Sequence, residues 1–261
     1  MFPASRIVCL TEETVETLYL LGEQGRIVGV SGYVVRPKEA RRDKPRVSAF
    51  TSADTEKILA LRPDLVFTFS DLQADIVADL IRHGLQVHAF NHRTIAGIFE
   101  MMRMVGAMVG ADAKAAGLVM RMETRLDEVR EHSAKLVRHP RVFFEEWDDP
   151  LISGIGWVSE LVEIAGGIDI FPDRARQAGA KERIVSTADV AAAAPDIIIG
   201  SWCGKKFSPA KVKARPGFSE LPAVRNNQLY EIKSPLILQP GPACLTDGLD
   251  ALQKIIGDWG E

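Results

Sequence analysis

The sequence predicts an α/β protein of two Rossmann-like lobes with parallel sheets, joined by a single long α-helix. Three observations support this fold class. Short apolar segments alternate with helical patterns, similar landmarks occur in both halves of the chain, and an uninterrupted amphipathic segment separates the halves. The expected division is an N-terminal lobe over residues 1–112, a connecting helix over 113–139 and a C-terminal lobe over 140–261.

The first half alternates strands and helices in a regular order. Residues 6–10 predict a strand and 11–21 a helix, and Gly22 and Gly25 interrupt the pattern before a second strand at 26–30. Further strands are expected at 65–69 and 87–90, on either side of a helix at 76–83 that Gly84 ends. This alternation is typical of a parallel sheet covered by helices.

The second half repeats the same plan. A Pro-Asp turn before a buried strand, an Arg-led apolar strand and a glycine stop recur in the same order at similar offsets. The matched landmarks are Pro63-Asp64 with Pro195-Asp196, Arg6–Val8 with Arg141–Phe143, and Gly25 with Gly166. Two lobes of similar fold are therefore expected.

The segment between the halves reads as one helix. It contains no proline and, after Gly117, no glycine, and apolar residues recur at Leu118, Met122, Leu126, Val129 and Leu136. At about 1.5 Å rise per residue a helix over 113–139 would reach roughly 40 Å, and Pro140 would end it. Such a tether would let the lobes hinge only slightly, so a ligand cleft between them would be nearly preformed.

Composition excludes several classes of protein. With 46% hydrophobic and 26% charged residues the chain is typical of soluble globular proteins. A net charge of −3 without a sustained basic run argues against nucleic acid as a partner.

No apolar run approaches the roughly 20 residues that a membrane-spanning helix needs. The start of the chain shows no apolar export signal, which leaves either a cytosolic protein or a processed mature form. Cys9, Cys203 and Cys244 allow at most one disulfide.

Aromatic residues gather after the predicted strands. Trp147, Trp157 and Trp202, three of the four tryptophans, fall on predicted strand-end loops. A single loop tryptophan is most often a lid on the core, whereas three that converge suit a large, planar, partly apolar ligand. Tyr33 and Phe69 hold the corresponding positions in the first half, and His92 is the one histidine at a site-like position.

No catalytic constellation emerges. Glu145, Glu146, Asp148 and Asp149 fall on a predicted loop, where successive carboxylates point apart, and such clusters are more often solvated than catalytic. The chain has no Gly-x-Ser-x-Gly, Walker or His-Glu-x-x-His motif, and its histidines are too scattered to hold a metal. We therefore expect a binding protein with neither an intrinsic cofactor nor a metal.

Several segments, in order along nearly the whole chain, resemble the helical-backbone substrate-binding proteins of metal-chelate ABC transporters. They are Glu-Lys-Ile-Leu-Ala-Leu-Arg-Pro-Asp-Leu-Val at 56–66, Glu-Trp-Asp-Asp-Pro at 146–150, Gly-Trp-Val-Ser-Glu-Leu-Val-Glu-Ile-Ala-Gly-Gly at 156–167, Leu-Pro-Ala-Val-Arg-Asn-Asn-Gln-Leu-Tyr at 221–230 and Gln-Pro-Gly-Pro at 239–242. Within this family the chain looks closest to the cobalamin-binding branch. The elements that it shares with that branch are Glu-Trp-x-Asp-Pro at 146–150, the tryptophan at 157 and Cys-Gly at 203–204.

The resemblance implies a monomeric periplasmic protein that captures cobalamin or a related metal chelate in the interlobe cleft for an ABC transporter permease. It adds Glu146, Cys203 and Gln239 to the implied ligand-binding residues, beside the aromatic residues and His92. It also implies that Asp75 and Glu220 dock onto arginines of the permease. Ferric siderophore and haem remain alternative ligands, and a cytosolic corrinoid carrier or enzyme on the same frame remains the alternative class.

Overall fold

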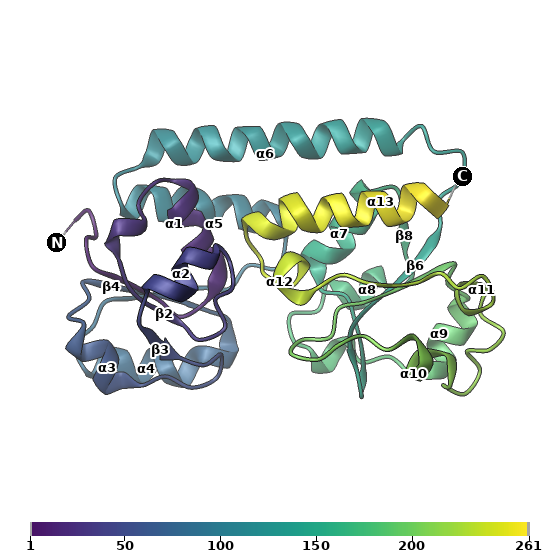
Figure 1. Ribbon diagram of the computed structural model, residues 1–261, viewed down its shortest axis with the longest axis horizontal. Helices are drawn as coiled ribbons and strands as arrows, with labels where there is room; N and C mark the ends of the chain where they lie inside the picture. The colour runs from purple at the N-terminus through teal and green to yellow at the C-terminus, as the bar shows by residue number, and fades with distance from the viewer. Residues whose placement is uncertain (1, 260–261) are drawn as a thin grey trace. The chain divides into compact units, whose positions relative to one another are not determined.

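The computed structural model describes residues 2–259 and divides into two compact units. The first unit contains the residues up to His92 together with Ala96–Met122. The second contains Arg93–Ile95 and the residues from Glu123 onward. Each unit has its own sheet and its own covering helices (Figure 1), so the predicted α/β class is confirmed.

The sheet of the first unit is parallel throughout, in the order β3-β2-β1-β4-β5. Its strands are β1 (Ile7–Cys9), β2 (Ile27–Ser31), β3 (Arg46–Ser48), β4 (Leu65–Phe69) and β5 (Val87–Phe90). In the central strand Ile7 lies opposite Ile27 on one side and Leu65 on the other. All three residues of β1 are fully buried, as expected for a strand with helices on both faces.

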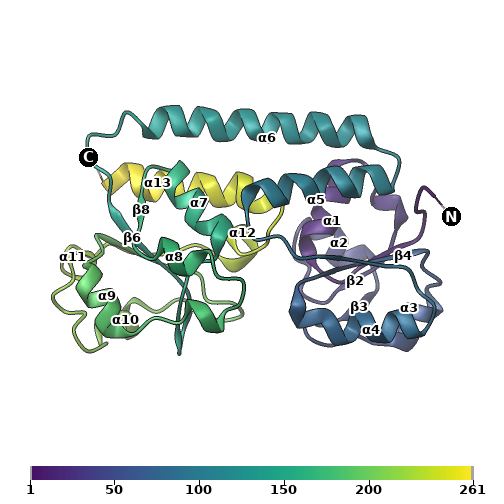
Figure 2. The same ribbon diagram turned by 180° about the vertical axis from the view of Figure 1, so that it is seen from behind.

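Helices cover both faces of this sheet. The helical segments are α1 (Glu12–Leu20), η1 (Gln24–Arg26), α2 (Lys38–Asp43), α3 (Thr55–Ala60), η2 (Asp71–Gln73), α4 (Ala74–Arg82) and α5 (Ile95–Met108). Figures 1 and 2 show α1 and α5 on one face, with α3 and α4 on the other. On the second face Ile58 of α3 and Leu80 of α4 pack against Val8 and Val66 of the sheet.

The predicted connecting helix is present but shorter than expected. Helix α6 covers Asp112–Ser133, and its residues are divided between the two units after Met122. The predicted end at His139 is wrong, because the helix stops at Ser133. There the Ser133 hydroxyl donates to the carbonyl of Ile164 (2.8 Å), and a Cβ at Gly166 would lie only 2.9 Å from the Ser133 Cβ. The last turn of α6 thus packs closely against residues 164–166.

The sheet of the second unit is mixed. Its strands are β6 (Arg141–Asp148), β7 (Leu151–Ser153), β8 (Ile168–Asp169), β9 (Ile197–Gly200) and β10 (Leu229–Glu231). The order is β10-β9-β6-β7, with β8 also paired to β6. Strand β7 runs antiparallel to β6, with Trp147 opposite Ile152. A purely parallel second sheet was therefore a wrong expectation, because β6 continues through 145–148 and turns back at Asp149-Pro150.

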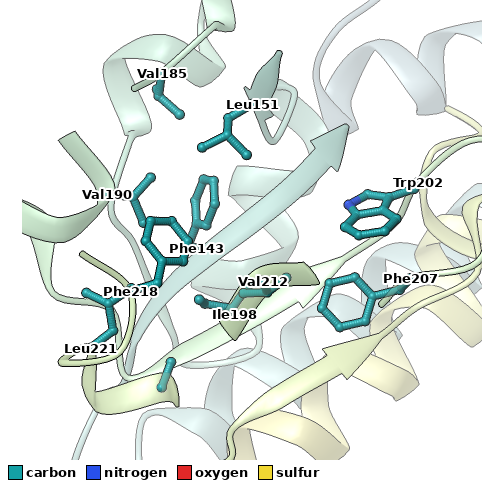
Figure 3. Close-up of a cluster of buried hydrophobic side chains, with 11 residues drawn as sticks. Phe143, Leu151, Val185, Val190, Ile198, Trp202, Phe207, Val212, Phe218 and Leu221 are labelled. Atoms are coloured by element: carbon teal, nitrogen blue, oxygen red, sulfur yellow. The ribbon is translucent and has the colours of Figure 1, made fainter. Parts of the chain in front are cut away.

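Helices also cover both faces of the second sheet. They are α7 (Gly156–Ile164), α8 (Pro172–Ala175), η3 (Lys181–Arg183), α9 (Thr187–Ala193), α10 (Pro209–Lys213), α11 (Pro222–Arg225), α12 (Ser234–Ile237), the π-helical segment η4 (Cys244–Gly248) and α13 (Leu249–Trp259). Figure 3 shows a core cluster of this unit, in which Phe143, Ile198 and Val190 pack together and Trp202 lies beside Phe207. No described helix is both long and apolar enough to cross a membrane.

Candidate functional site

Three of the four acidic residues of the second-unit motif, Glu145, Glu146 and Asp148, lie within strand β6 and not on the expected loop. Glu145 is completely buried and accepts from both terminal nitrogens of Arg215, each at 2.7 Å. The Trp202 indole N–H also donates to it, at 2.9 Å. Burial raises the pKa of the Glu145 carboxyl, and the Arg215 guanidinium offsets part of that effect. Glu145 therefore anchors the two segments that carry Trp202 and Arg215.

Glu146 is engaged in a second ion pair, which is partly buried. Its carboxylate accepts from the Nη1 and Nη2 atoms of Arg183, at 2.6 and 3.0 Å. The Arg183 side chain is only 2% exposed and also donates to the carbonyl of Ser153. Glu146 thus balances the charge of the buried Arg183 guanidinium. Its ligand-binding role stays a prediction.

Trp147, Asp148 and Lys205 form a mixed aromatic and charged surface, called here the Trp147 surface. The Lys205 ammonium lies 3.8 Å from the centroid of the Trp147 ring and makes an ion pair with Asp148. Trp147 is half-buried, and its indole N–H donates to the carbonyl of Asp149 at 2.9 Å. The indole face and the ammonium are thus held together at the carboxyl end of β6.

Trp157 and Trp202 are core residues in this structure. Trp157 lies in the first turn of α7, so its expected place on a loop was wrong. It is 3% exposed, and its indole N–H donates to the carbonyl of Ile237 at 2.9 Å. Trp202 follows β9 as predicted but is equally buried, 5.0 Å from the Phe207 ring. Of the three predicted tryptophans only Trp147 has substantial exposed surface.

Cys203 and Gln239 lie on loops of the second unit. Cys203 is exposed directly after Trp202, whereas Cys9 and Cys244 are buried, and the structure describes no disulfide among the three. Gln239 is half-buried between α12 and η4, and its carbonyl accepts from the Gly241 backbone N–H at 2.8 Å. Among the described residues no three His, Cys, Asp or Glu side chains are placed to hold a metal ion.

The predicted ligand-binding residues of the first unit lie at or just beyond the carboxyl ends of its strands. Phe69 ends β4 and lies edge-to-face with His92, which follows β5, at 5.2 Å between ring centroids. Phe90 extends this cluster, 6.2 Å from His92. Tyr33 follows β2 and is 57% exposed. The structure therefore brings Phe69 and His92 together, as their strand positions predict, and leaves the Tyr33 ring at the surface.

Sequence reasoning missed two buried polar residues at the same edge. Gln73 is fully buried, accepts from the Phe69 N–H (3.0 Å) and donates to the Phe50 carbonyl (2.8 Å), so it ties neighbouring loops together. Glu13 is 1% exposed and accepts from the Thr11 hydroxyl. Burial raises the pKa of Glu13 to about 8. The helix dipole is the usual explanation for an acidic residue in the first turn of a helix. The sequence alone therefore gives no sign that Glu13 is buried.

Comparison with known proteins decides the family. A family model described as periplasmic binding protein matches residues 7–236, most of the chain. The chain belongs to the periplasmic binding protein family. The resemblance found in the sequence is thereby confirmed, and so, at the level of family, is the prediction of a substrate-binding protein of the ABC transporter class.

Individual relatives of this periplasmic binding protein extend over nearly its whole length. It is 27% identical over 257 residues to the uncharacterized ABC transporter substrate-binding lipoprotein YvrC of Bacillus subtilis, which covers 96% of this chain and 79% of that protein. It is 25% identical over 248 residues to a vitamin B12-binding protein of Vibrio parahaemolyticus, covering 93% and 86%. A solved structure of a possible iron-binding (periplasmic solute-binding) protein from Staphylococcus epidermidis shares the fold, with a TM-score of 0.83, 23% identity and coverage of 97% and 99%.

The two residues expected to dock a permease are both exposed in this periplasmic binding protein. Asp75 is the second residue of α4. The Glu220 side chain is 82% exposed just before α11, with its carboxylate 4.0 Å from Arg225. Their docking role stays a prediction.

Proposed function

We propose that this periplasmic binding protein captures cobalamin or a related metal chelate and delivers it to the permease of an ABC importer. The observation that carries the proposal is the similarity, over 93% of the chain, to a protein named for vitamin B12 binding. In this proposal the chelate is cargo, the protein has no catalytic role and no intrinsic cofactor, and it works as a monomer on the outer side of the cytoplasmic membrane.

Two surfaces support the proposed ligand class. The Trp147 surface offers an indole face with an adjacent charge at the end of β6. In the first unit the exposed Tyr33 and the half-buried His92, which packs against the buried Phe69, offer aromatic surface at the ends of their strands. Flat aromatic groups with a few polar neighbours suit a large, planar, partly apolar ligand such as a corrin. The interlobe cleft inferred from the sequence stays a prediction.

Calorimetric titration of the whole chain tests the proposal. Cyanocobalamin should bind saturably, with a dissociation constant below the tens of micromolar that correspond to about −6 kcal/mol. Trp147→Ala should weaken this binding at least about tenfold, equal to about 1.4 kcal/mol. Trp259→Ala is the matched control, because Trp259 is the one tryptophan outside the predicted site, and it should leave the affinity unchanged.

The same titration separates the alternative ligands. Binding of haem or a ferric siderophore without binding of cyanocobalamin would replace cobalamin by an iron chelate and keep the transport role. Failure of all three classes to bind would refute the proposed function. Genes for a permease and an ATPase beside this gene would support import, and their absence would favour a cytosolic corrinoid carrier.

A further inference from the structure

Lys205 is held at the exposed edge of the Trp147 surface by two independent contacts. Its ammonium lies over the Trp147 ring at 3.8 Å and 5.5 Å from the Trp202 ring, an arrangement typical of a cation–π interaction. Its ion-pair partner Asp148 is only 7% exposed, whereas the Lys205 side chain is 35% exposed. Within this pair the carboxylate is thus largely covered, and the lysine side chain is the more open to solvent.

The positive charge here exceeds the negative charge that faces it. Residues 205–215 contain five basic residues and no acidic one. Arg215 at the end of this segment is neutralised by the buried Glu145, but Asp148 faces both Lys205 and, at 4.0 Å, Lys211. The neighbouring Asp149 is exposed, where water screens its charge. The single negative charge of Asp148 is therefore shared by the two ammonium groups of Lys205 and Lys211.

We propose that Lys205 selects chelates that carry an anionic group, a carboxylate or a phosphodiester, at the edge of their planar ring system. This inference rests on the proposed function. An anionic group that approaches Trp147 would gain a charge-assisted hydrogen bond from Lys205. An uncharged group at the same place would have to desolvate the ammonium without compensation. Lysine suits this role, because its flexible stem lets the ammonium turn from Asp148 toward a ligand.

Pairs of probes that differ in this anionic group test the proposal. Cyanocobalamin carries a phosphodiester that dicyanocobinamide lacks, and haem carries propionates that its dimethyl ester masks. Lys205→Met should weaken binding of the anionic member of a pair at least about tenfold, and that of its partner less than about threefold. Lys205→Arg should retain the preference. Lys254→Met, at an exposed lysine of α13, changes the net charge equally and should have no effect.

Two further variants cover the case in which Lys205→Met fails to fold because Asp148 is left unpaired. Asp148→Asn/Lys205→Met removes both charges and should lose the preference for the anionic probe. Asp148→Asn alone releases Lys205 and should strengthen binding of the anionic probe, with steeper weakening by salt.

The outcomes separate this inference from the function on which it rests. Equal weakening of both members of a pair in Lys205→Met, or no weakening of either, would overturn the role of Lys205 while the wild-type protein still binds its chelate. Absence of binding of all four probes to the wild-type chain would overturn both the proposed function and the inference.

Discussion

Replacement of Glu13 by glutamine should change how the stability of the protein depends on pH. Glu13 lies in the first turn of α1 and is 1% exposed. Burial, with a smaller effect of Glu12, raises the pKa of this carboxyl from 4.5 to about 8, although the Thr11 hydroxyl favours the ionised form. Near neutral pH the native state therefore holds Glu13 protonated, whereas the unfolded chain ionises it.

The magnitude follows from proton linkage. Between pH 4.5 and 8 the native state binds about one proton more than the unfolded state at this position, so the free energy of unfolding falls as the pH rises. The stability that the wild-type protein gains from keeping Glu13 protonated is fully present below pH 4.5 and is lost by pH 8. About 1.4 kcal/mol per pH unit over this interval gives a loss of about 5 kcal/mol. Glutamine has nearly the same shape and cannot ionise, so Glu13→Gln should avoid this loss.

Urea unfolding followed by circular dichroism at pH 5, 7 and 9 measures the effect. Glu13→Gln should match the wild-type protein at pH 5 and exceed its stability by several kcal/mol at pH 9. Burial raises the pKa of the nearby Cys9 thiol to about 12, so that thiol stays protonated throughout. Glu56→Gln, at an exposed position in the first turn of α3, is the control. A constant difference between Glu13→Gln and wild type at all three pH values would refute the reasoning.

Three other substitutions test separate parts of the structure. Glu146→Gln should destabilise the protein by about 3–5 kcal/mol, because it leaves the buried Arg183 without a carboxylate; a thermal midpoint equal to that of wild type would contradict this. Gly200→Ala should cost about 1–3 kcal/mol in urea unfolding, since a methyl group there would overlap the Phe207 ring, and unchanged stability would show that the ring moves aside. Glu220→Ala should keep chelate affinity but weaken complex formation with the cognate permease, as expected for a rim charge; loss of affinity with normal complex formation would move Glu220 to the ligand site.

The strands that the sequence predicted well are those whose formation depends on local pattern. The bounds of β4 and β5 match the prediction, because each is a short run of apolar and aromatic residues between turn signals. Strand β3 was missed, since Arg46-Val47-Ser48 has a single apolar residue and forms only by pairing with β2. Strand β7 was missed for a similar reason, because it exists only as the return strand of a hairpin with β6.

The end of α6 shows the same limit for a helix. The amphipathic pattern continues to Leu136, and the proline at 140 is the first strong stop signal in the sequence. The helix nevertheless ends at Ser133, where the hydroxyl bonds to Ile164, more than thirty residues later in the chain. A contact so distant in sequence leaves no periodic signal, so pattern analysis places the end at the nearest proline.

The motif at 145–148 explains why the site was only partly predictable. Sequence pattern predicted the strand that begins at Arg141 but put this motif on the loop after it, whereas the motif lies within β6. The roles of its charges depend on partners 37 to 70 residues away. Glu145 is tied to Arg215 and Glu146 to Arg183, so both serve to fix loops onto β6. Asp148 holds Lys205 against Trp147. Glu145 and Glu146 therefore fix the surrounding loops, and Asp148 positions the Lys205 ammonium against the Trp147 ring.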